Sequence, residues 1–86
     1  MHTVVLLAHA LNLAEQLGYS VRQEWLDGNG GGCCQLRGRK LLVVDLAQSP
    51  ADQFEMVLAA LRSEPQAIQL SMPQPLRDLL RVRQSA

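Results

Sequence analysis

The residues of this chain that could do chemistry are concentrated between Gly28 and Asp45. They form a glycine-rich segment, the adjacent pair Cys33 and Cys34, and a basic turn that leads into an apolar run. Backbone N–H groups in a glycine-rich turn can bind an anion, and a cysteine thiolate can act as a nucleophile or a metal ligand. The sequence therefore offers one candidate site for an anionic ligand and another for thiol chemistry.

The candidate anion site combines three glycines, one cysteine and three arginines: Gly30, Gly31, Gly32, Cys33, Arg22, Arg37 and Arg39. The glycine segment has neither a GxGxxG pattern leading into a helix nor the Lys-Ser/Thr ending of a P-loop, and we expect a strand after it. A flexible connection between two strands explains the glycines equally well. Ligand binding at these residues is therefore a hypothesis that stands beside a structural one.

The adjacent cysteines do not form a disulfide framework, because a bridge between neighbours closes almost no loop and is strained. Successive side chains of a strand point to opposite faces, so Cys33 and Cys34 cannot bind one metal ion together without a bulge. His2 and His9 are two helical turns apart, about 10 Å, which is too far to chelate one ion by themselves. We expect one small buried cysteine, no metal, no cofactor and no catalytic residue, and keep a thiol-based redox or metal site as a third hypothesis.

Asp45 lies at the end of the apolar run that begins at Leu41. A carboxylate buried without a partner is costly. We therefore expect Asp45 to have a structural partner such as Arg22, or to lie at the exposed end of a strand near Ser49. No second carboxylate or histidine has a spacing that would make it part of an acid–base pair.

Composition restricts the class of protein. The 86 residues include 8 basic and 8 acidic side chains, and only 3% are aromatic. Proteins that bind nucleic acids or acidic membranes usually carry a basic surface, and base stacking needs aromatic side chains. We therefore expect no nucleic-acid partner and no membrane partner. The first apolar run is too short to span a bilayer and the cysteines suit a reducing compartment, so we predict a cytoplasmic protein.

The patterning predicts one small α+β domain over residues 1–86, with element order α-β-β-β-α-α. Apolar residues at helical spacing predict a first helix capped by Thr3 and ended by Gly18. Strands are expected at 20–26, 33–37 and 40–46, and their short connections favour a three-stranded antiparallel meander.

The second half of the chain is expected to be helical. Ser49, Pro50 and Asp52 are typical of a helix start, because serine caps, proline suits the first turn and an acidic residue can complete a capping box. Pro65 ends this long helix, and residues 67–70 of the following connector form a short strand or a helical turn. A short last helix is expected over 75–83, with 84–86 as a frayed tail.

The third predicted strand is apolar at every position from Leu41 to Val44, so both of its faces need cover. If the helices cover one face only, a homodimer or the C-terminal helix must cover the other. Our first hypothesis is therefore a non-catalytic protein that associates through its sheet with a second copy or with a protein partner.

Several short motifs resemble those of short bacterial proteins of unknown function: Leu17-Gly18-Tyr19, Val21-Arg22, Gly30-Gly31-Gly32-Cys33 and Arg37-Gly38-Arg39-Lys40 before a strand that ends in Asp45. The resemblance covers about residues 10–62 and implies a bacterial cytosolic origin and no activity. The element order also resembles small zinc metallopeptidases of the ImmA/IrrE type. Their HExxH motif would lie on the helix after the hairpin, which here reads DQFEMVLAAL without histidine, so the resemblance implies no peptidase activity.

Overall fold

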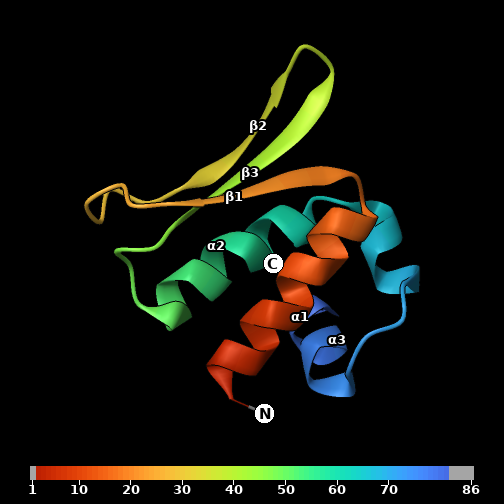
Figure 1. The fold of residues 1–86 in the computed structure, drawn as a ribbon. Helices are drawn as coiled ribbons and strands as arrows, with labels where there is room; N and C mark the ends of the chain where they lie inside the picture. The colour runs from red at the N-terminus through yellow and green to blue at the C-terminus, as the bar shows by residue number, and fades with distance from the viewer. Residues whose placement is uncertain (1, 82–86) are drawn as a thin grey trace.

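The computed structural model describes residues 2–81 as one sheet packed on a layer of helices (Figure 1). The elements in chain order are α1 (Thr3–Gln16), β1 (Tyr19–Glu24), β2 (Gly32–Leu36), β3 (Arg39–Asp45), α2 (Pro50–Arg62), the 3-10 helix η1 (Pro65–Gln69) and α3 (Gln74–Arg81). The predicted α+β class is confirmed. The predicted tail at 84–86 lies outside the described residues.

The sheet is mixed, so the predicted antiparallel meander is wrong. Its strand order is β1-β3-β2. β1 runs parallel to β3, with Val21 opposite Leu42, and β2 runs antiparallel to β3, with Cys33 also opposite Leu42. The prediction paired strands that are adjacent in sequence, which is the commoner arrangement. Here the most apolar strand, β3, takes the centre instead.

The connection from β1 to β2 makes this order possible by crossing the end of β3. It must span two strand spacings, about 10 Å. Three residues of this crossing segment have positive φ, namely Asp27 at 57°, Gly28 at 81° and Gly30 at 85°. Gly31 passes so close to the backbone of Val43 that any Cβ would overlap the carbonyl oxygen of that residue. The glycines therefore serve a tight crossing over the central strand.

The hydrophobic core lies between the sheet and helices α1 and α2. Leu42 and Val44 of β3 are fully buried against it, as are Ala10 of α1 and Val57 and Leu61 of α2. α3 packs on α1 and α2 on the side away from the sheet (Figure 1). Because the C-terminal helix joins the helical layer, it does not cover the second face of the sheet. None of the helices in the described part of the chain is long and apolar enough to cross a membrane.

The helix ends largely follow the sequence signals. Ser49 Oγ accepts a hydrogen bond from the Asp52 N–H at 3.1 Å, and Pro50 is the first residue of α2, as predicted. Gly18, with φ of 97°, ends α1, and buried Tyr19 follows it. The residue that precedes α1 is His2 and not Thr3, and it makes no side-chain cap. The connector after α2 contains the 3-10 helix η1, which confirms a helical turn in place of a strand.

Strands β2 and β3 form a hairpin that extends beyond the helical layer (Figure 1). Its two-residue turn has positive φ at Arg37, 54°, and at Gly38, 78°, which is the type I′ geometry. All four residues from Cys33 to Leu36 are exposed, on both faces of the strand. Its pairing with β3 is therefore the main attachment of β2, which also lies close to α2.

Gly31→Ala tests the close crossing. We expect it to lower the free energy of unfolding by about 2 kcal/mol or more, since the backbone must move to admit the new Cβ. Gly32→Ala is the matched control, because a Cβ at Gly32 meets nothing within 4 Å, and it should change that free energy by about 0.5 kcal/mol or less. Urea unfolding of dilute protein measures both, and equal stability of the two variants would contradict the close crossing.

Candidate functional site

Asp45 is the most completely enclosed polar residue of the described chain, with 0% of its surface exposed. Its Oδ1 accepts hydrogen bonds from the N–H groups of Leu26 at 3.0 Å and Ala47 at 2.9 Å. Its Oδ2 accepts one from the N–H of Gly30 at 2.9 Å. The carboxylate thus binds both the crossing segment, through Leu26 and Gly30, and the turn into α2, through Ala47.

The environment of Asp45 favours its charged form. Burial raises the pKa of the carboxyl group, but the surrounding backbone N–H groups, led by that of Gly30, lower it more, and the resulting pKa lies below the ordinary value. The predicted structural partner of Asp45 is therefore present, but it is a set of backbone N–H groups and not Arg22, and the alternative of an exposed position is wrong. Backbone N–H groups replace the arginine because the crossing segment wraps around the end of β3.

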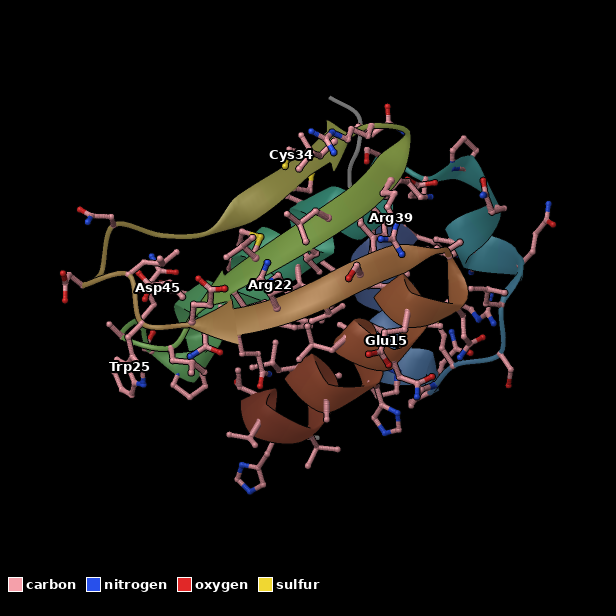
Figure 2. The ribbon with its side chains drawn as sticks, turned by 45° about the horizontal axis from the view of Figure 1, so that its top comes forward. Glu15, Arg22, Trp25, Cys34, Arg39 and Asp45 are labelled. Carbon is pink, nitrogen blue, oxygen red and sulfur yellow. The ribbon has the colours of Figure 1, made fainter. Side chains whose placement is uncertain are left out.

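The glycine segment does present a backbone donor to an anion, but that anion is the chain's own. The N–H of Gly30 points to Asp45, and Gly31 lies against β3. Arg37 and Arg39 lie at the far end of β3, roughly 20 Å away along the strand. Figure 2 shows Asp45 and Arg39 at opposite ends of the sheet. Arg22, by contrast, lies opposite Val43, which is also opposite Gly32. The structure therefore keeps two of the three predicted arginines away from the glycines and does not assemble the composite anion site.

Two of the predicted arginines do share a surface. Arg22 and Arg39 border a shallow depression on the outer face of the sheet, whose apolar lining is Leu36 and Leu41. Arg22 also pairs with Glu24, with 3.1 Å between Nε and Oε2, and both side chains are largely exposed. An exposed pair of this kind contributes little to stability. The depression therefore combines apolar side chains with positive charge, and Glu24 places a negative charge beside Arg22 on the same face of the sheet.

Neither cysteine is buried, which contradicts the expected small buried cysteine. Cys33 is opposite Leu42 and points to the helix side of the sheet, whereas Cys34 is opposite Leu41 and points to the outer side. Both thiols are unpaired and exposed, because β2 extends beyond the helices. Within residues 2–81, no three His, Cys, Asp or Glu side chains are placed to hold a metal ion.

A polar cluster that the sequence did not predict ties the sheet to the end of α2. Glu64 Oε2 accepts hydrogen bonds from the Tyr19 hydroxyl at 2.8 Å and from Lys40 Nζ at 3.2 Å. Lys40 Nζ also lies 4.7 Å from the centre of the Tyr19 ring. Tyr19, Lys40 and Glu64 border a second depression, which Cys33, Cys34 and Gln35 of β2 also line. The cluster escaped prediction because Glu64 lies in a segment with no periodicity, 24 residues after Lys40.

The hydroxyl of Tyr19 is stabilised in its neutral form. Burial, together with the hydrogen bond to and the negative charge of Glu64, raises the pKa of Tyr19 to about 12. The Tyr19 hydroxyl donates to the Glu64 carboxylate, which also accepts from Lys40, so all three polar groups have partners within the protein. The cluster is therefore suited to holding the helical layer on the sheet.

Trp25 also departs from expectation. In the strand predicted over 20–26, the alternation of side chains would place Trp25 on the same face as Val21. β1 instead ends at Glu24, and 72% of the Trp25 surface is exposed (Figure 2). The physical reason is that the chain turns into the crossing segment at this point.

Comparisons with protein-family models, with curated proteins and with solved structures found no match for this chain.

Asp45→Asn should destabilise the protein at pH 7, because its amide would direct N–H donors at a backbone N–H. We expect the melting temperature to fall by about 5 °C or more. Because the pKa of Asp45 is lowered in the folded protein, its contribution to stability is fully present above the pKa of the unfolded chain. That contribution is lost as the pH falls through the pKa of the folded protein, so the wild type should become less stable below roughly pH 4. The difference between wild type and variant should therefore shrink between neutral pH and pH 3. Asp78→Asn, at an exposed helical position, is the control, and a constant difference over that range would contradict the assignment.

Tyr19 is the single tyrosine of the chain, so its ionisation can be followed by ultraviolet absorbance. We expect half-ionisation near pH 12 in the folded protein, and Glu64→Gln should lower this value toward 10 by removing the negative charge. Glu55→Gln, an exposed change on α2, should leave it unaffected. Circular dichroism at each pH identifies the folded range, and ionisation near 10 in folded wild type would be evidence against the cluster.

Proposed function

We propose that this protein is a non-catalytic association module that binds a second copy of itself through its sheet. The observation that carries the proposal is the outer face of the sheet, on which none of the helices within residues 2–81 packs. On that face Leu36 is 62% exposed, Cys34 is exposed, and Leu41 and Val43 are only half-buried. Grouped apolar side chains of this kind on a small domain are typical of a protein contact.

The charges around this face favour a second copy as the partner. Arg22, Arg39 and Glu24 border the apolar residues, so both signs are present on one surface. In a symmetric dimer the same surface meets itself, and mixed charge permits contact without a net repulsion. A nucleic acid or an acidic membrane would instead favour a surface of positive charge only.

The most strongly perturbed ionisable groups support association over catalysis. Asp45 is occupied by backbone N–H groups, and Tyr19 donates its hydrogen bond to Glu64. A catalytic acid or base needs a polar group that is available to a substrate. The two unpaired thiols also suit a reducing compartment, in keeping with the cytoplasmic location that we predict.

Native mass spectrometry of the reduced protein, from about 10 to about 200 µM, tests self-association. We expect a dimer that Val43→Lys weakens by about tenfold or more in dissociation constant, because a charge is placed in the apolar contact. Val4→Lys is the matched control, since Val4 is 61% exposed on α1, far from the outer face. A monomer throughout this range would overturn the proposal.

A further inference from the structure

Strand β2 has the properties of an unprotected sheet edge. Its sequence, GCCQL, contains no charge and no proline, and its pairing with β3 runs without a bulge. The edge strands of natural sheets usually carry a charge, a proline or a bulge, because an unpaired strand is a template for another chain. The opposite edge, β1, does carry Arg22 and Glu24. Among the described residues nothing covers the outer side of β2, so this edge is the one open to pairing.

The turn determines which backbone groups of β2 point outward. In a turn of this type the carbonyl of Leu36 faces the N–H of Arg39, so Leu36 directs its backbone groups toward β3. The direction alternates along an antiparallel pair. Cys34 therefore also points toward β3, whereas Cys33 and Gln35 present their N–H and C=O groups to the outside.

We propose that two copies of this chain join their β2 strands side by side, antiparallel, about a two-fold axis at Cys34. The proposal rests on the self-association proposed above and places the contact along the edge of the sheet, where Leu36 and Val43 are the residues of the outer face that take part. Three strands from each copy would form one continuous sheet of six, with both helical layers on the same side. The occupant of the open edge is therefore a second copy of the chain.

The backbone pattern selects this register. Residues that exchange hydrogen bonds across the new pair must both point outward, so Cys33 has to face either Gln35 or Cys33 of the second copy. When Cys33 of each copy faces Gln35 of the other, the N–H and C=O groups of both residues are all hydrogen-bonded. The two-fold axis generates this pair once on each side of Cys34. This register also overlaps the full strand from Gly32 to Leu36.

The side chains agree with the same register. Leu36 would lie opposite Gly32 of the second copy, and Gly32 leaves open space on the outer face. Val43 of that copy is the next residue across the sheet from Gly32, so the exposed leucine would pack over the glycine against the valine. The exposure of Leu36 and the lack of a side chain at Gly32 thus complement each other.

Cysteine cross-linking tests the register directly. At the axis, Cys34 faces its own copy in a non-hydrogen-bonded pair with Cα atoms about 4.5 Å apart, within disulfide range. Cys33 and its copy would be offset by two residues, about 8 Å apart, which is beyond that range. The single-cysteine variants Cys33→Ser and Cys34→Ser are matched to each other. Under mild oxidation we expect Cys33→Ser, which retains Cys34, to form covalent dimer at least about tenfold faster.

A change of the backbone provides the second measurement. Gln35→Pro removes an outward N–H that β3 does not use, so the monomer should remain folded by circular dichroism while the native-mass dimer is lost. Gln35→Thr keeps the N–H and should retain the dimer. A dimer that survives Gln35→Pro, with no preference for Cys34, would overturn edge pairing and leave self-association through the outer face standing. A chain that is monomeric up to about 200 µM would overturn both proposals.

Discussion

The carboxylate of Asp45 is the interaction on which the rest of the structure depends. It lies at the end of the central strand, fully buried, and binds the N–H groups of Leu26, Gly30 and Ala47. These donors come from the segment that crosses the sheet and from the turn into α2. One charged group thus fixes the path of the chain on both sides of β3. Without it, the two donors of the crossing segment, the N–H groups of Leu26 and Gly30, would lose their partner in a partly buried position.

The same crossing produces the surface that we assign to association. Because the chain passes over the end of β3, the apolar strand is central and the short strand β2 becomes an edge. The hairpin then extends beyond the helices, which leaves β2 exposed on both faces and along its outer side. A small sheet with one such strand gains stability when another strand joins it. Fold and proposed function therefore share one physical cause.

The helical layer is held to the sheet by different means at its two ends. Near the crossing segment the attachment is Asp45 and the turn that follows it, and at the other end it is Tyr19 and Lys40 on Glu64. Between them lies a core of leucine, valine and alanine with a single phenylalanine. In such a core the polar attachments fix the position of the helices, since small aliphatic side chains alone can repack at low cost.

The sequence by itself determined the elements, because their signals are local. The serine and proline at the start of α2, the glycine after α1 and the glycine of the reversal between β2 and β3 act within a few residues. The structure ends β2 at Leu36, so Arg37 belongs to the turn and not to the predicted strand 33–37. It also predicted the need for a second cover on the sheet, from the unbroken run between Leu41 and Val44. Only the tertiary structure decided the strand order, the partners of Asp45, the exposure of Cys33 and Trp25, and the contact of Glu64 with Tyr19. Each depends on a crossing that joins residues far apart in sequence, and the choice of a central strand is a competition for burial that no local pattern encodes.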